Sequence, residues 1–258
     1  MIARGNRRTE RLDLATATWQ RNQWNVDVLE LSRDTVTGAL TMALRSPPGL
    51  VYPEEEHFYD CEEDLFQFDG EFHHDEIDSY REGDYVYRPI GTVYGHGIGS
   101  HQGGLTIASL AREMRRFHFQ GHPGPWRGHY LVDRLWNPRP VAPFIVGANS
   151  LSWQTVGSGV AIRALRGQPG ERSTLSGASI HSPWAADAVF ILRLDPGFDA
   201  PFPTWDGFVL ELLTLGGRAT IGAEPWYRGC YAFDGAQGRC VVGESLQLYV
   251  RAFANLTA

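Results

Sequence analysis

Short apolar segments alternate with Gly- and Pro-rich breaks along most of the chain. In NVDVLEL (25–31) and LQLYV (246–250), hydrophobic and polar residues alternate with a period of two, the pattern of a strand with one buried face. Similar segments are GALTMAL (38–44), DLFQF (64–68), DYVYRP (84–89), LTIAS (105–109), VAIRAL (160–165), AVFILRL (188–194), FVLELLTL (208–215) and CYAF (230–233). Many short strands between turn signals predict an all-β sandwich or barrel with few short helices. Helical spacing is present only in Arg7–Arg21 and Leu110–Phe119, where we expect short helices.

The two halves of the chain resemble each other. LSRDTVTGALTMALRSPPGL (31–50) aligns with SIHSPWAADAVFILRLDPGF (179–198), and in both copies an Arg is followed, after two residues, by Pro-Gly. DLFQFDGEF then corresponds to FVLELLTLGGR, and YREGDYVYRPIG to YRGCYAFDG. Two copies indicate a duplicated unit and not a solenoid. We therefore predict an N-terminal barrel (1–111), a connector packed on the barrels (112–150) and a C-terminal barrel (151–258). Arg45 and Arg193 hold equivalent positions, which suggests a structural role.

Two motifs in the first half carry a family resemblance. The spacing His57-x-Tyr59-x3-Glu63-x6-Gly70 is followed by Gly83-x5-Pro89-x-Gly91-x2-Tyr94. This pattern resembles the two cupin motifs, G-x5-H-x-H-x(3,4)-E-x6-G and G-x5-P-x-G-x2-H. Together with the duplication, the resemblance implies a bicupin, a chain of two double-stranded jelly-roll barrels.

The cupin resemblance also implies one bound transition metal ion, such as Fe, Zn, Ni or Mn. The family takes two His and one Glu from the first motif and one His from the second. This chain keeps His57 and Glu63, but Tyr59 and Tyr94 stand where the other two histidines belong, and Gly49 lies too far before His57. The resemblance therefore supplies only half of the usual ligand set.

Two routes could restore a metal site. A phenolate from tyrosine is a hard ligand suited to Fe(III). Alternatively His96, which shares a strand face with Tyr94, could complete a set of His57, Glu63 and His96, with His101 as a weaker candidate. Two histidines and a carboxylate are a known geometry for open metal sites. A metal-free polar pocket is the third possibility, because cupin barrels that have lost ligands serve as binding modules.

The remaining candidate residues concern the substrate. Beside a metal, Tyr59 and Tyr94 could donate or accept protons. Arg88 could anchor a substrate carboxylate through its guanidinium, or it could form an ion pair with the acidic loop. In the second half, Pro203, Trp205 and Val209 stand at the positions of His57, Tyr59 and Glu63, so no such metal site is expected there.

These residues favour a metal-dependent enzyme that acts on a small, oxygen-rich organic substrate by proton transfer, as a lyase, isomerase or cyclase. A mononuclear non-haem iron dioxygenase that cleaves a dicarbonyl or aromatic substrate is the first alternative. A non-catalytic cupin that binds a small ligand is the second.

Composition limits the other possibilities. The chain has no lysine, which excludes a Schiff base with pyridoxal phosphate and a nucleotide-binding P-loop. A net charge of −7 argues against binding to nucleic acid. No apolar run is long enough to cross a membrane, and the charged N-terminus does not look like a secretion signal. With three cysteines lacking zinc-type spacing, we expect a cytoplasmic monomer or homodimer.

Overall fold

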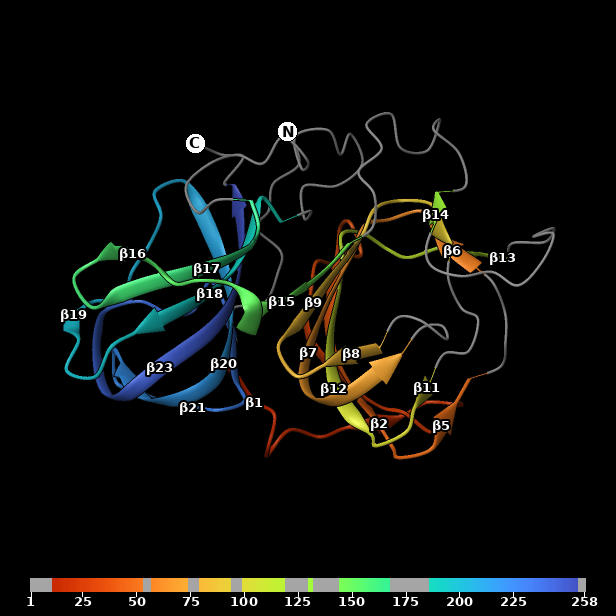
Figure 1. The fold of residues 1–258 in the computed structure, drawn as a ribbon, viewed down its shortest axis with the longest axis horizontal. Coiled ribbons are helices and arrows are strands. Elements are labelled where there is room, and N and C mark those ends of the chain that lie inside the picture. The colour runs from red at the N-terminus through yellow and green to blue at the C-terminus, as the bar shows by residue number, and fades with distance from the viewer. Residues whose placement is uncertain are drawn as a thin grey trace. The chain divides into compact units, whose positions relative to one another are not determined.

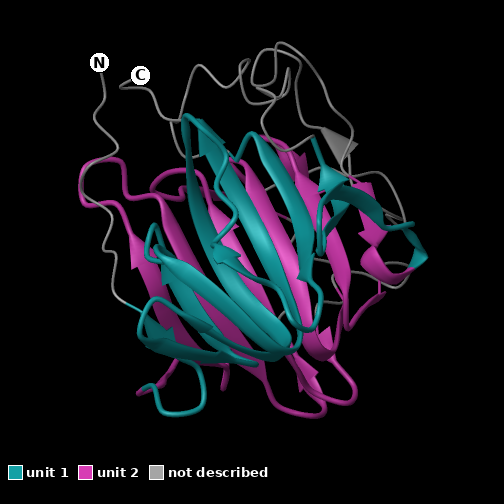
Figure 2. Ribbon diagram, turned by 90° about the vertical axis from the view of Figure 1, so that its left-hand side faces the viewer, with its two compact units in different colours: residues 1–17, 150–179, 185–258 teal, residues 18–149, 180–184 magenta. Residues whose placement is uncertain are grey.

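The structure, a computed structural model, describes residues 11–52, 57–73, 79–93, 99–118, 130–131, 144–167 and 186–254. The chain divides into two compact units (Figure 2). We call residues 18–149 and 180–184 the first barrel, and residues 1–17, 150–179 and 185–258 the second barrel. Apart from a 3-10 turn at Ala148–Ser150, the regular elements in the described residues are strands. The prediction of an all-β fold is confirmed.

The first barrel contains an antiparallel sheet in the order β15-β9-β7-β12-β4-β3-β2 (Figure 1). Its strands are β2 (Gln20–Arg21), β3 (Asp27–Arg33), β4 (Leu40–Ser46), β7 (Glu63–His73), β9 (Asp84–Arg88), β12 (Gly104–Leu110) and β15 (Phe144–Gly147). The first barrel also contains shorter strands: β5 (Leu50–Val51), β6 (His57–Tyr59), β8 (Ser79–Arg81), β10 (Thr92–Val93), β11 (Gly99–Ser100), β13 (Arg116–His118) and β14 (Tyr130–Leu131). Of these, β6 pairs with β13, β10 with β14, and β8 with β7.

The second barrel repeats this strand order. Its sheet runs β1-β22-β20-β23-β18-β17-β16, so β20 takes the place of β7, β22 that of β9, and β23 that of β12. The strands are β1 (Leu12–Asp13), β16 (Gln154–Gly157), β17 (Val160–Arg166), β18 (Ala188–Leu194), β19 (Asp199–Pro201), β20 (Phe208–Ile221), β21 (Glu224–Tyr227), β22 (Cys230–Phe233) and β23 (Arg239–Ala254). Each of the ten segments that the sequence predicted as strands overlaps a strand of one of the two barrels.

Matching side-chain contacts support the duplication. Arg45 is the sixth residue of β4, and Arg193 is the sixth residue of β18. The guanidinium of Arg45 lies 4.0 Å from the ring centre of Trp19, and that of Arg193 lies 4.5 Å from the ring centre of Trp153. Each arginine therefore makes a cation–π contact with a tryptophan just before the first strand of its own sheet, as a structural role requires.

The outer strand of each sheet comes from an unexpected part of the chain. β1 pairs with β22, with Leu12 opposite Tyr231, so residues 11–17 belong to the second barrel, whereas the sequence division assigned them to the first. β15 pairs with β9 of the first barrel, with Phe144 opposite Tyr87. Of the predicted connector, residues 112–118, 130–131 and 144–150 are described.

The two predicted helices are wrong wherever the structure describes them. Residues 11–21 form β1, a turn and β2, and Leu110 ends β12. The arginines that follow hold a loop: Arg112 forms an ion pair with Asp60 at 2.9 Å, and the backbone N–H of Arg115 donates to the same carboxylate. Residues 116–118 then form β13. Pairing with Asp60 and β6 therefore outweighs a weak local helical preference. Residues 7–10 and Phe119 lie outside the described part.

Each barrel has an apolar core cluster. In the second barrel it includes Phe190, Leu192 and Leu248, each fully buried, and half-buried Val160, Phe198, Trp205 and Phe208 pack against it. In the first barrel the core includes Leu65, Val86 and Tyr80, and half-buried side chains line it: Val28, Met42, Leu44 and Tyr52. Among the described residues, half-buried apolar side chains thus border both cores.

Candidate functional site

Glu63 and Arg88 face each other inside the first barrel. They are register partners at the ends of the neighbouring strands β7 and β9. Leu65 and Val86, two residues away on each strand, belong to the barrel core, and residues two apart on a strand point to the same side. The guanidinium Nη1 of Arg88 donates to Glu63 Oε2 at 2.7 Å. Arg88 is 1% exposed and Glu63 8% exposed, so this is a buried ion pair.

Tyr80 holds the other end of the Arg88 guanidinium. Nη2 of Arg88 donates to the Tyr80 hydroxyl at 3.0 Å, and the Tyr80 ring centre lies 5.9 Å from the guanidinium carbon. Tyr80 is itself buried, on the short strand β8. Both terminal nitrogens of Arg88 therefore donate to side chains of the same barrel, and the arginine is fixed in place.

His57 lies on the neighbouring two-stranded sheet and contacts Arg116. Nη2 of Arg116 lies 3.1 Å from Nδ1 of His57. Because a guanidinium can only donate, Nδ1 must accept, which places the proton of the neutral imidazole on Nε2. His57 is buried, and the ring of Tyr59 meets it edge-on with 5.2 Å between ring centres.

The structure therefore groups the predicted site residues in two sets. Glu63 pairs with Arg88, and His57 packs on Tyr59. Tyr94 and His96 lie outside the described residues. His101, the weaker ligand candidate, is exposed and stacks on His73 at 4.8 Å.

The described donor atoms do not fit a metal ion. Among the residues that the structure describes, no three His, Cys, Asp or Glu side chains are grouped so that they could hold one. Glu63, at the position of the family's carboxylate ligand, is already paired with a buried cation. A metal at this carboxylate would stand close to the Arg88 charge in a region of low dielectric. At His57, the acceptor nitrogen already contacts a guanidinium, and the other nitrogen carries the proton.

Arg116 and Tyr80 are site residues that sequence reasoning missed. Tyr80 aligns with Tyr227 in the repeat. The sequence gives no sign that Tyr80 is the partner of Arg88. Arg116 lies within the segment predicted to be helical. The pairing of β13 with β6 brings Arg116 to His57. The run of basic residues around Arg116 does not predict that contact.

Aromatic side chains lead from the surface to the core beside this site. Trp24, 37% exposed, packs on Tyr52 with 5.8 Å between ring centres, and Tyr52 packs edge-on against Phe72 at 6.4 Å. Burial raises the pKa of Tyr52 to about 12. Its phenol therefore stays protonated at neutral pH and can donate a hydrogen bond.

Cys61 lies between β6 and β7 in the chain but is not a reactive nucleophile. Burial first, and then the nearby carboxylates of Glu63 and Asp60, raise the pKa of its thiol. Cys230 and Cys240 are also buried and unbridged. Because the thiolate is the reactive form, a raised pKa makes the thiol of Cys61 unreactive.

The second barrel has a buried ion pair at a different position. Arg251 Nη1 donates to Glu211 Oε2 at 2.6 Å, and both residues are buried. Tyr231 donates to Glu211 as Tyr85 donates to Asp64, which aligns the two sheets residue by residue. The equivalent of Glu63 is then Leu210, one residue beyond Val209, the expected match. Leu210 belongs to the apolar core of the second barrel.

Comparisons with known proteins agree with this architecture. Residues 7–111 match the family model described as the ChrR cupin-like domain. A "putative dioxygenase" from Nostoc punctiforme has a similar structure, with a TM-score of 0.69 and 16% sequence identity, covering 98% of this chain and 89% of that one. No curated protein sequence matches.

Two further solved structures have the same fold at lower similarity. A mutant of Bacillus subtilis oxalate decarboxylase has a TM-score of 0.55 at 12% identity, over 99% of this chain and 78% of that one. Hazelnut (Corylus avellana) vicilin has a TM-score of 0.55 at 12% identity, over 96% of this chain and 86% of its own. In the described residues, no helix is long and apolar enough to cross a membrane. Residues 7–111 thus match the ChrR cupin-like domain model, and the two-barrel fold is shared with these solved structures.

Proposed function

We propose that this protein is a small-molecule-binding cupin whose first barrel works without a metal ion. The observation that carries the proposal is the buried 2.7 Å ion pair between Arg88 and Glu63. It places a fixed organic cation against the carboxylate that would otherwise hold a metal. Because Tyr80 holds the same guanidinium, the positive charge is part of the folded barrel.

The inner face of the first barrel suggests the chemistry of the ligand. Val28, Met42 and Leu44 offer a half-buried apolar surface. The protonated phenol of Tyr52 can donate a hydrogen bond, and the exposed ring of Trp24 packs beside it. These groups suit a small organic molecule with an apolar body and an oxygen acceptor.

A metal-dependent enzyme is the competing function. It would use His57, Glu63 and His96 as ligands, with Tyr59 and Tyr94 as proton-transfer residues. The burial of both His57 and Glu63 favours it, but Arg88 and Arg116 would have to leave their present partners.

Metal analysis of the purified protein separates the two functions. We expect far less than one metal ion per chain, and no change in melting temperature after treatment with a chelator. His57→Ala and His96→Ala should then leave the metal content unchanged, as should the matched control His101→Ala. A stoichiometric metal that His57→Ala and His96→Ala remove, and His101→Ala does not, would overturn the proposal. Oxygen consumption by that metal-loaded protein would identify a dioxygenase.

Ligand binding is tested by thermal shift with a panel of small aromatic and aliphatic carbonyl compounds. A compound that binds the folded state raises the melting temperature. We expect Tyr52→Phe to abolish the shift, whereas Tyr227→Phe, on the second barrel, preserves it. Shifts that persist in Tyr52→Phe would place the ligand elsewhere.

A further inference from the structure

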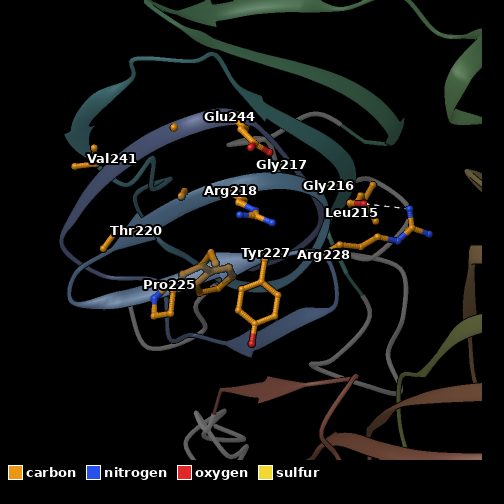
Figure 3. A pocket seen from close by; sticks show the side chains of 13 residues that line it. Leu215, Gly216, Gly217, Arg218, Thr220, Pro225, Tyr227, Arg228, Val241 and Glu244 are labelled. Atoms are coloured by element: carbon orange, nitrogen blue, oxygen red, sulfur yellow. Dashed lines mark hydrogen bonds between the residues drawn. The ribbon is translucent and has the colours of Figure 1, made fainter.

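A pocket of about 840 Å³ opens on the second barrel, between β20, β21 and β23 (Figure 3). It lies apart from the Glu63–Arg88 cluster in sequence and belongs to the other unit. Its lining includes Gly216, Gly217, Arg218, Tyr227 and Glu244. The function proposed above gives this pocket no role.

Irregular pairing of β20 creates the hollow. Along its contact with β23 the register shifts between Thr214 and Gly216, between Gly216 and Arg218, and between Arg218 and Ala219. Such bulges bend a strand and redirect its side chains. Gly217 has a φ of +83°, and a Cβ atom there would lie 1.9 Å from the carbonyl oxygen of Ser245. Only glycine fits at this position.

Two opposite charges stand on adjacent strands in this pocket. Arg218 on β20 is the register partner of Glu244 on β23, and both side chains are exposed. In the described residues, no hydrogen bond or ion pair holds either side chain. Figure 3 shows the Arg218 guanidinium pointing into the middle of the pocket, with Glu244 at its edge.

We propose that this pocket binds a small zwitterion of the amino-acid type. The ligand carboxylate would accept hydrogen bonds from Arg218, and the ligand ammonium would donate to Glu244. A simple anion would be repelled by Glu244 and a simple cation by Arg218, whereas a zwitterion satisfies both. Tyr227, Pro225 and Val241 line the same pocket and give an apolar ligand side chain a surface to contact.

The hydroxyl of Tyr227 donates to Asp13 at 2.6 Å, which fixes its ring at the edge of the pocket. Exposed charges interact weakly because water and salt screen them. Binding should therefore be weak and should weaken further as salt is added.

Calorimetric titration of the full chain with L-leucine tests the proposal. N-acetyl-L-leucine lacks the ammonium group, and L-leucinamide lacks the carboxylate. We expect saturable binding of L-leucine and about two- to fivefold weaker binding of each blocked analogue, the loss expected for one exposed ion pair. Absence of saturable heat with L-leucine, or equal binding of either analogue, overturns the proposal.

Variants locate the binding. Arg218→Gln and Glu244→Gln should each weaken L-leucine binding by about two- to fivefold. Arg33→Gln and Glu30→Gln change an exposed ion pair on β3 of the first barrel and should leave binding unchanged. Melting curves check that all four variants fold. Unchanged binding in Arg218→Gln or Glu244→Gln overturns the assignment, and the analogue comparison tests it without any substitution.

Discussion

Arg88 and Glu63 show how one residue pair can decide the chemistry of a site. A charge taken out of water is costly unless a partner and hydrogen bonds compensate it. Glu63 and Tyr80 compensate the Arg88 guanidinium in this way. Removing one partner is therefore much more disruptive than removing both.

The resulting prediction concerns the free energy of unfolding. Glu63→Ala should lower it by about 3–5 kcal/mol, because Arg88 stays buried without its carboxylate. The double variant Glu63→Leu with Arg88→Leu should lose clearly less. Asp199→Asn, which removes one partner of the exposed ion pair with Arg239, serves as the control and should change little. Denaturant unfolding measures all three; if Glu63→Ala resembles the control, the pair contributes no stability.

Sequence spacing could bring these residues into one candidate site but could not choose their partners. The motif placed His57, Glu63 and Arg88 near the same barrel end, and it left Arg88 open to a substrate or an acidic loop. The choice depends on the register between β7 and β9, which sets Glu63 opposite Arg88. Register is fixed by packing across the sheet, so local spacing does not encode it.

At the scale of elements, alternation predicted strands well, and the helical spacing failed. The ten segments became strands because they are short, rich in β-branched and aromatic residues and bounded by turn residues, and several, such as AVFILRL, are buried on both faces. Leu110–Phe119 was misjudged because its arginines contact Asp60 and its end pairs with β6. These partners lie some 50 residues away in the chain, beyond the reach of a local pattern.

The bent strand β20 gives a prediction at this scale. Gly217→Ala should lower the free energy of unfolding by roughly 1–3 kcal/mol, since it forces a positive φ on alanine and meets the Ser245 carbonyl. Gly216→Ala is the adjacent control, because a Cβ atom there has no heavy atom within 4 Å. Thermal unfolding compares the two. Equal melting temperatures would show that the bulge relaxes freely.

At the scale of the whole molecule, the duplication has produced two different interiors. Leu44 and Leu192 hold equivalent positions of β4 and β18. Leu192 is fully buried in the apolar core, whereas Leu44 is only half buried beside the candidate site. At this pair of positions the second barrel is tightly packed, whereas the first leaves its leucine partly accessible to water.

The same substitution at both positions tests this difference. Leu192→Ala should cost about 2–5 kcal/mol of unfolding free energy, the range for a leucine removed from a tight core. Leu44→Ala should cost distinctly less, because water already reaches that face. Denaturant titrations of the two variants, each against the unsubstituted protein, give the comparison. A larger cost at Leu44 would mean that the inner face of the first barrel is packed after all.

The edge strands have a consequence for how this chain can be divided. β1 directly precedes β2 in the chain but pairs in the second barrel, and β15 directly precedes β16 but pairs in the first. The strands of the second barrel are therefore not one continuous stretch of the chain, because β1 lies before the first barrel. A protein fragment starting at residue 150 would lack β1, so backbone N–H and C=O groups along β22 would be unpaired. Such an exposed strand edge promotes aggregation. A transfer of the second copy alone to another protein would leave β1 behind, whereas residues 18–149 contain every strand of the first sheet.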